Sequence, residues 1–174
     1  MILHLPKKNC YIVNQYDQVI GQQTRSQVHR LGLRHRAVYL LVFNNRGQLF
    51  LQKRSMSKDC SPGLWDASAS GHVDTGEDYD TAVIREAREE LGIILTDKPE
   101  KLFKINASTQ TAQEFVWLYR YQHQGPFQLH SEEISDGDWF SREKISKWIT
   151  NHTTDLTPSF VFIWKKYEQY LAHS

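Results

Sequence analysis

Residues 71–93 read GHVDTGEDYDTAVIREAREELGI and fill the pattern G-x5-E-x7-R-E-U-x-E-E-x-G-U, in which U is an aliphatic residue. The part from Tyr79 to Leu91 lacks proline and glycine and is rich in alanine, glutamate, arginine and leucine, which favours a helix. Gly92 follows the last periodic residue, where glycine commonly ends a helix. The stretch therefore predicts a loop that leads into an amphipathic helix.

The predicted helix has an apolar flank and an acidic flank. At about 100° per residue, one arc gathers the apolar side chains Val83, Ile84, Ala87 and Leu91. The adjoining arc, across the small Ala82, carries Glu86, Glu89 and Glu90. Like charges at i and i+4 cost about 0.2–0.5 kcal/mol, and anions near the end of a helix are also disfavoured. A divalent cation such as Mg²⁺ or Mn²⁺ would turn this repulsion into attraction, because both prefer oxygen ligands. The alternative is a solvated acidic face.

The residues around the glutamates favour the metal interpretation. Glu77 lies near the positive start of the helix, where a carboxylate is stabilised. Arg85 can hold a carboxylate of the preceding loop as a fork, which lysine does less rigidly. We interpret the stretch from Gly71 to Glu77, with Gly76 inside it, as the loop of a loop–helix module with a metal-binding face.

Length and composition are those of an ordinary globular protein. At 174 residues, with 40% hydrophobic and 24% charged residues, we expect a single domain over residues 1–174. No apolar run approaches a transmembrane span, and the N-terminus lacks the layout of a signal peptide. Cys10 and Cys60 do not form a disulfide framework. We therefore expect a cytoplasmic protein without a membrane partner.

Charge is balanced overall but uneven along the chain. The net charge of +1 argues against stable nucleic-acid binding. Residues 1–60 carry ten Lys and Arg against two acids, whereas residues 71–100 carry nine acids against three Lys and Arg. A basic segment facing an acidic metal site suits an anionic substrate, although scattered surface charges would give the same count.

Strand and helix patterns follow each other along the rest of the chain. Strands are expected at residues 10–14, 18–22, 35–44, 48–53, 64–70, 101–108, 114–122 and 138–140, and short or long helices at 26–32, 79–91, 141–151 and 157–172. The first hairpin and short helix occupy residues 1–30. Thr157 before Pro158 is a typical helix start. The last helix carries an apolar stripe that indicates core packing, namely Phe160, Ile163, Trp164, Tyr167 and Leu171.

Residues 71–93 resemble the Nudix box of the Nudix hydrolase superfamily, and the similarity continues outside the box. The stretches HRAVYLLVFN (35–44), LQKRSMSK (51–58), PGLWDASASGH (62–72) and EEISDGDWF (132–140) are similar to one branch of that superfamily. The branch groups with isopentenyl-diphosphate isomerases and includes small bacterial hydrolases. The resemblance implies the Nudix fold, an α/β/α sandwich with a mixed β-sheet and an N-terminal β-hairpin.

Two features separate the chain from the isomerases that it resembles. Those enzymes use a catalytic cysteine immediately before the box glycine, where this chain has Ser70. A hydroxyl replaces a thiol poorly in proton transfer to carbon, because its pKa is far higher. The isomerases also have a degenerate box, whereas this one keeps all three glutamates. Hydrolysis is the favoured interpretation; an isomerase of allylic diphosphates and a non-catalytic nucleotide-binding protein are the alternatives.

The resemblance implies roles for individual residues. Metal binding is expected at Glu86, Glu89, Glu90, Glu77 and Gly71. The proton acceptor is expected to be Glu89, Glu86 or Glu133, with Arg85 orienting a carboxylate. Substrate contacts are expected at Arg54, Arg36, Lys53 and Trp65, with packing as the alternative for Trp65. A second metal site like that of the isomerases would use His35, His72 and Glu114, with His29 nearby in sequence; ordinary hydrogen bonds at strand ends are the alternative.

The expected activity is that of a Mg²⁺- or Mn²⁺-dependent pyrophosphohydrolase. Its small-molecule substrate would be a nucleoside di- or triphosphate, or a nucleoside diphosphate linked to another group. Cations that bridge phosphate oxygens offset their charge and lower the pKa of an attacking water. Either a monomer or a homodimer is compatible with the sequence, and no loop carries a signature that identifies the substrate.

Overall fold

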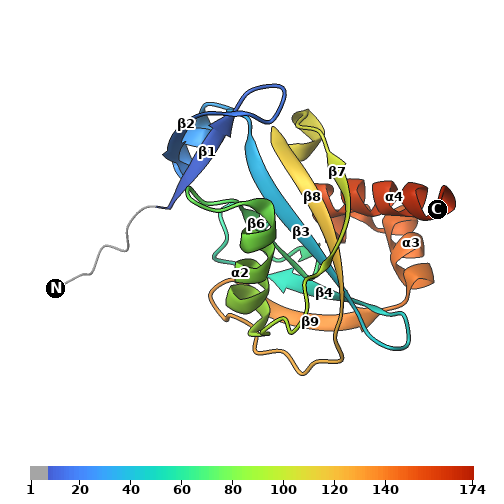
Figure 1. Cartoon of the computed structure of the whole chain (residues 1–174). Helices are drawn as coiled ribbons and strands as arrows, with labels where there is room; N and C mark the ends of the chain where they lie inside the picture. Colours follow the sequence, from blue (N-terminus) through green and yellow to red (C-terminus); the bar gives the residue numbers. More distant parts are fainter. Residues whose placement is uncertain (1–7) are drawn as a thin grey trace.

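The computed structural model describes residues 8–174 and places a mixed β-sheet at its centre (Figure 1). A separate antiparallel hairpin, β1 (Asn9–Val13) and β2 (Val19–Thr24), leads into α1 (Arg25–Arg30). The central sheet has seven strands: β3 (His35–Phe43), β4 (Leu49–Arg54), β5 (Trp65–Asp66), β6 (Ala69–His72), β7 (Glu100–Ile105), β8 (Glu114–Gln122) and β9 (Ile134–Phe140). Strand β3 runs parallel to β8 and antiparallel to β6, which makes the sheet mixed.

Helices cover both faces of this sheet (Figure 1). One face packs against α2 (Tyr79–Leu91), and the other packs against α3 (Arg142–Asn151) and α4 (Pro158–Ala172). Alternate residues of β3 enter the two cores: Val38, Leu40 and Val42 lie on the α2 side, and Ala37, Tyr39 and Leu41 on the α4 side. The predicted α/β/α sandwich with an N-terminal hairpin is therefore confirmed.

The helix ends follow the signals in the sequence. The side chains of Asp78, Ser141 and Thr157 each accept a hydrogen bond from a main-chain N–H in the first turn of α2, α3 and α4. Gly92 ends α2 in the left-handed conformation, with φ of +66°. Short 3-10 helices at Thr109–Thr111 and Thr153–Asp155 complete the described elements.

The stretch 64–70, predicted as one strand, forms two. Strand β5 pairs with β4, and β6 pairs with β3, so the chain changes partner between them. The Ser68 hydroxyl fixes this crossing, because it accepts from the Val42 N–H (2.8 Å) and donates to the Phe50 carbonyl (2.6 Å). Strand β6 then continues through Gly71 and His72, so Gly71 lies in a strand and not in the predicted loop. Strand β9 also starts earlier than predicted, at Ile134, because it pairs along most of β4.

The buried face of α2 differs from the predicted one. Ile84 is 44% exposed, whereas Ala82 is fully buried and Glu90 is only 8% exposed. The helix is therefore turned so that one glutamate of the acidic flank points into the protein, beside Ala87 and Leu91. An apolar arc drawn from the sequence could not anticipate this, because it assumes that every carboxylate faces water.

Asp17, at the turn of the hairpin, anchors β1 and β2 to the rest of the fold. Its carboxylate accepts hydrogen bonds from Arg36 Nε (2.7 Å), from the Tyr79 hydroxyl (2.9 Å) and from Lys104. These partners lie on β3, α2 and β7. Arg36, which we expected to contact the substrate, is thus placed by the structure in a contact that holds the hairpin.

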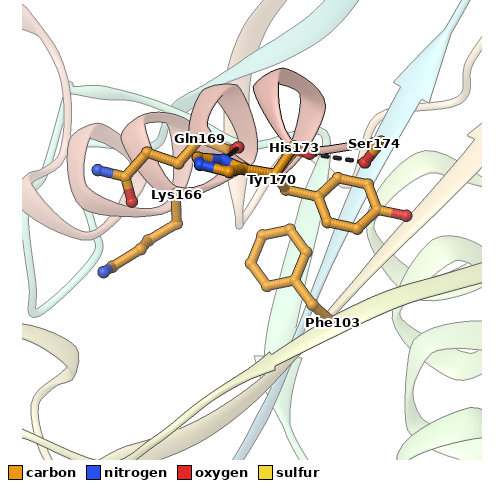
Figure 2. Close-up of a pocket in the computed structure, with 6 residues that line it drawn as sticks. All are labelled: Phe103, Lys166, Gln169, Tyr170, His173 and Ser174. Carbon is orange, nitrogen blue, oxygen red and sulfur yellow. Dashed lines mark hydrogen bonds between the residues drawn. The ribbon is translucent and has the colours of Figure 1, made fainter.

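A surface hollow lies between β7 and the C-terminal end of α4 (Figure 2). The rings of Phe103 and Tyr170 face each other there, with centroids 5.0 Å apart. Lys166, Gln169, His173 and Ser174 complete the lining, and none of these six residues is a candidate from the sequence. We attach no function to this hollow.

No helix within residues 8–174 is both long and apolar enough to span a membrane.

Candidate active site

Arg85 is the centre of the acidic flank of α2. Its Nε and Nη2 donate to the two carboxylate oxygens of Glu77, at 2.6 and 2.9 Å, which confirms the predicted fork. Its Nη1 reaches Glu86 at 2.6 Å and Glu89 at 3.2 Å, and its Nη2 also donates to the carbonyl of His72 at 2.9 Å. One guanidinium therefore ties the loop, the helix and β6 together.

Glu77 is fully engaged by the protein. Besides the fork from Arg85, one of its oxygens accepts the main-chain N–H of Asp74 at 3.1 Å. Glu77 thus closes the turn that precedes α2. Its expected role as a metal ligand stays a prediction, since both of its oxygens already have partners.

Glu90 carries the most unfavourable charge of the site. It lies between α2 and the sheet, where its carboxylate accepts hydrogen bonds from Gln52 and from the Ser70 N–H (3.3 Å). Burial raises the pKa of Glu90 well above its ordinary value, the nearby charge of Glu86 raises it further, and the two donors oppose the shift. A buried carboxylate needs a compensating charge, which these neutral donors do not supply.

Glu86 lies against the backbone of β6. Burial raises the pKa of this carboxyl, the positive charge of Arg85 works in the opposite direction, and the charge of Glu89 adds to the rise. A Cβ atom placed on Gly71 would overlap the carboxyl group of Glu86. Gly71 is therefore required for close approach of a side chain to the strand, while its expected part in metal binding stays a prediction.

The three glutamates form one electrostatic group without meeting at one point. Arg85 attracts Glu86 and Glu89, whereas Glu90 points to Gln52. Lys8 adds a second cation at the edge, with its Nζ 3.3 Å from Glu89. Carboxylates at this density, set beside main-chain carbonyls, are the oxygen donors that Mg²⁺ and Mn²⁺ take.

Glu133 is brought to the same side as Glu90. Its negative charge contributes to the raised pKa of Glu90, although Glu133 itself lies in the turn before β9. Burial opposes the charged form of Glu133, but its ion pair with Lys58 outweighs burial and lowers its pKa. The neighbouring Ser55 N–H donates to the Glu133 carbonyl at 2.9 Å, so the loop after β4 and this turn are joined. Glu133 therefore remains a candidate proton acceptor.

The other residues expected to contact the substrate, Arg54, Trp65 and Lys53, do not share one environment. Arg54 pairs with the buried carboxylate of Asp66 at 3.4 Å and donates to the Cys60 carbonyl at 3.1 Å. Burial raises the pKa of Asp66, and the positive charge of Arg54 opposes this rise. Trp65 packs edge-on against Phe140 and Trp148 on the α3 side, which is the packing alternative that the sequence left open. Lys53 precedes Arg54 on β4, half-buried.

Three histidines and Glu114 meet at the start of β3. One nitrogen from each of His29, His35 and His72 lies within 4.8 Å of the other two. His29 Nε2 and His72 Nε2 are 3.1 Å apart, and Glu114 Oε1 lies 3.2 Å from His72 Nε2 and 3.3 Å from His35 Nε2. Strands β3, β6 and β8 supply His35, His72 and Glu114 through their pairing, and α1 supplies His29.

The histidine cluster combines buried imidazoles with a carboxylate. His35 Nδ1 is 2.8 Å from the Leu33 carbonyl and donates to it, so Nε2 is the ring atom that faces the cluster. Among the described residues, that Nε2 is buried without a hydrogen-bond partner. Burial, followed by the charges of His72 and His35, lowers the pKa of His29 to about 4. Burial disfavours ionised Glu114, yet the neighbouring imidazoles outweigh burial and lower its pKa to about 2.

Two residues of these clusters were not among the expected ligands and contacts. Gln52 follows three apolar residues in the stretch LFLQ, and a polar residue in such a strand is a signal that the sequence offers. Its partner Glu90 can be identified only in the folded structure. The sequence places His29 near His35 but does not show that its ring joins the cluster. The turn between α1 and β3 folds it back over the strand, so it completes the cluster.

The comparisons with known proteins agree with this geometry. Residues 33–160 match the family model described as NUDIX domain. An uncharacterised Nudix hydrolase of Yersinia pestis is 36% identical over 149 residues, which cover 83% of this chain and 79% of that protein. Isopentenyl-diphosphate Delta-isomerase 2 of Photorhabdus laumondii is 31% identical over 160 residues, covering 89% of this chain and 86% of that enzyme.

A solved structure supports the same assignment. DR0079 from Deinococcus radiodurans superposes with a TM-score of 0.82 at 28% identity, covering 91% of this chain and 98% of that one. The matched region contains the loop and helix that carry the acidic flank, together with the strands that support it. The chain therefore belongs to the Nudix hydrolase family.

Proposed function

We propose that the protein is a Mg²⁺- or Mn²⁺-dependent pyrophosphohydrolase that cleaves a nucleoside di- or triphosphate or a nucleoside diphosphate derivative. The observation that carries this proposal is the buried carboxylate of Glu90 beside Glu86, at a position where burial disfavours the charged form of both groups. A cation bound there compensates both charges and, when present, offsets the charge of a diphosphate.

The side chains divide into those that hold the cation and those that act on the substrate. Glu86, Glu89 and Glu90 are the proposed ligands, with the main chain at Gly71 beside them. Arg85 orients the loop through Glu77 and need not touch the substrate. Glu133, kept ionised by Lys58, or Glu89 accepts the proton of the attacking water. Arg54 is the proposed phosphate contact, since its side chain is still partly exposed at 15%.

An isomerase of allylic diphosphates is the second candidate, because an isomerase is among the relatives and a histidine cluster adjoins β6. Ser70 precedes Gly71 in the sequence, and its hydroxyl is a far weaker acid than a thiol. The box glutamates favour hydrolysis over this alternative. We further propose that residues 1–174 act as one Nudix domain, in the cytoplasm, as a monomer or a homodimer.

The primary test is a panel of nucleoside diphosphate derivatives, nucleoside triphosphates and isopentenyl diphosphate, incubated with Mg²⁺ or Mn²⁺ and read by mass spectrometry. We expect cleavage of a nucleotide pyrophosphate bond that ceases with chelator. Glu90→Gln should lower kcat by at least about 10²-fold, whereas Glu143→Gln on the far face should not change it. Interconversion of C5 isomers without cleavage would establish the isomerase instead.

Gly71→Ala should displace Glu86 and weaken cation binding. The added Cβ would overlap the carboxyl group of Glu86, so that side chain must leave the strand. We expect the Mn²⁺ Kd, measured by titration calorimetry, to rise about 10-fold or more, with a smaller change in the free energy of unfolding. Gly21→Ala is the matched control, since a Cβ there meets only an ordinary contact with Ile12. An unchanged Mn²⁺ Kd would remove Glu86 from the proposed ligands.

We also propose that His29, His35, His72 and Glu114 hold a second divalent ion. The separations of 3.1–3.3 Å between donor atoms are close to the edge of a tetrahedron with bonds of about 2.1 Å, which is roughly 3.4 Å. Imidazole nitrogens suit Zn²⁺ better than Mg²⁺ or Mn²⁺, so this site differs from the carboxylate site. The buried, unpartnered Nε2 of His35 supports this proposal.

His72→Asn should reduce the metal retained by the purified protein, and His152→Asn, far from the cluster, should not. Elemental analysis by mass spectrometry after gel filtration measures the Zn²⁺ and Mn²⁺ content per chain. We expect about one equivalent fewer in His72→Asn, because the donor set loses one nitrogen. An equal metal content in wild type and His72→Asn would show that these histidines make hydrogen bonds and do not bind a metal ion.

A further inference from the structure

Gln52 is a buried polar residue in the middle of the sheet. Its side chain is polar, yet the residue is only 3% exposed and follows the apolar residues Leu49, Phe50 and Leu51 on β4. Its Nε2 donates to Glu90 Oε2 and to the main-chain carbonyl of Ser68, the latter at 3.1 Å. Both hydrogens of the amide are therefore used, and the plane of the amide is fixed.

The second of these hydrogen bonds connects Gln52 to a rigid part of the fold. Ser68 is fully buried, and its hydroxyl bridges the Val42 N–H of β3 and the Phe50 carbonyl of β4. The position of Gln52 is thus set by the point at which β3 and β4 separate. Rigid supporting contacts of this kind hold a functional side chain within a narrow range of positions.

The chemistry of the amide suits a carboxylate that binds a cation. An amide donor orients a carboxylate but carries no charge of its own, so it does not compete with a divalent ion for Glu90. A Lys or Arg at position 52 would neutralise this charge, and an apolar residue would leave Glu90 with only the Ser70 N–H at 3.3 Å.

We infer that Gln52 is a positioning residue that fixes the carboxylate of Glu90 for binding the divalent cation. The inference rests on the proposed function, because it assumes the cation, and it assigns a role to a residue outside the box. Gln52 touches neither the substrate nor the reacting atoms. It acts through Glu90, and it links α2 to Ser68, at the point where β3 and β4 separate.

A solely structural role makes a different prediction. If Gln52 served only to satisfy the Ser68 carbonyl, its replacement would lower the stability of the sheet and leave cation affinity unchanged. If it positions Glu90, its replacement changes the Kd for the cation, and this change disappears once Glu90 can no longer act as a ligand.

The test is a Mn²⁺ titration followed by electron paramagnetic resonance, with urea unfolding of the same samples. Gln52→Met has a similar length but no donor, and we expect its Mn²⁺ Kd to rise about 10–100-fold, as for other contacts that support a ligand. Gln52→Asn keeps an amide in the strand but is one methylene shorter, and the same loss is expected. Gln48→Met, in the turn between β3 and β4, is the matched control with an unchanged Kd.

Combining Gln52→Met with Glu90→Gln separates positioning from stability. We expect the double variant to bind Mn²⁺ within two-fold of Glu90→Gln alone, because the carboxylate that Gln52 positions is gone. A wild-type Kd in both Gln52→Met and Gln52→Asn would overturn the inference while leaving the proposed function intact. Failure of wild type to bind Mn²⁺ would instead overturn the proposed function, and the role of Gln52 with it.

Discussion

The constraint on which the site depends is the burial of the Glu90 carboxylate next to Glu86. Two like charges on adjacent turns of α2 face the sheet, and they are opposed by the Arg85 guanidinium, by Lys8 at the edge of the site and by neutral N–H groups. Such an arrangement lowers the stability of a metal-free fold and is sustained by the packing of Ala82, Val83 and Leu91 on the same helix. The local cost is the reason to connect this helix with cation binding.

The rest of the fold supplies the geometry around that charge. The change of strand partner at Ser68 brings Gly71 under Glu86 and the Ser70 N–H to Glu90. Arg85 then joins β6, the turn at Glu77 and the helix into one unit. On the other face of β3, the histidine cluster forms because β6 and β8 both pair with β3. One strand arrangement thus assembles both clusters of candidate ligand side chains.

Local signals in the sequence were sufficient to predict most helices and strands, but they predicted fewer of the contacts within the site. Ser141 and Thr157 marked helix starts, and the fork from Arg85 to a carboxylate of the preceding loop followed from charge and spacing. The partner of Arg36 could not be predicted, because Asp17 is distant in sequence and meets it only when the hairpin folds back. The same applies to Gln52 and His29, whose partners lie on other elements. Helical periodicity also misjudged Ile84 and Glu90, because it treats charge as a sign of exposure.

The most direct test of this account is thermal unfolding of wild type and Glu90→Gln with and without Mg²⁺. Without the ion, Glu90→Gln should unfold at the higher temperature, since it removes a buried charge; each kcal/mol relieved corresponds to about 2–4 °C. Adding Mg²⁺ should raise the Tm of wild type more than that of Glu90→Gln. A wild-type Tm that does not respond to Mg²⁺ or Mn²⁺, together with a less stable Glu90→Gln protein, would contradict the account.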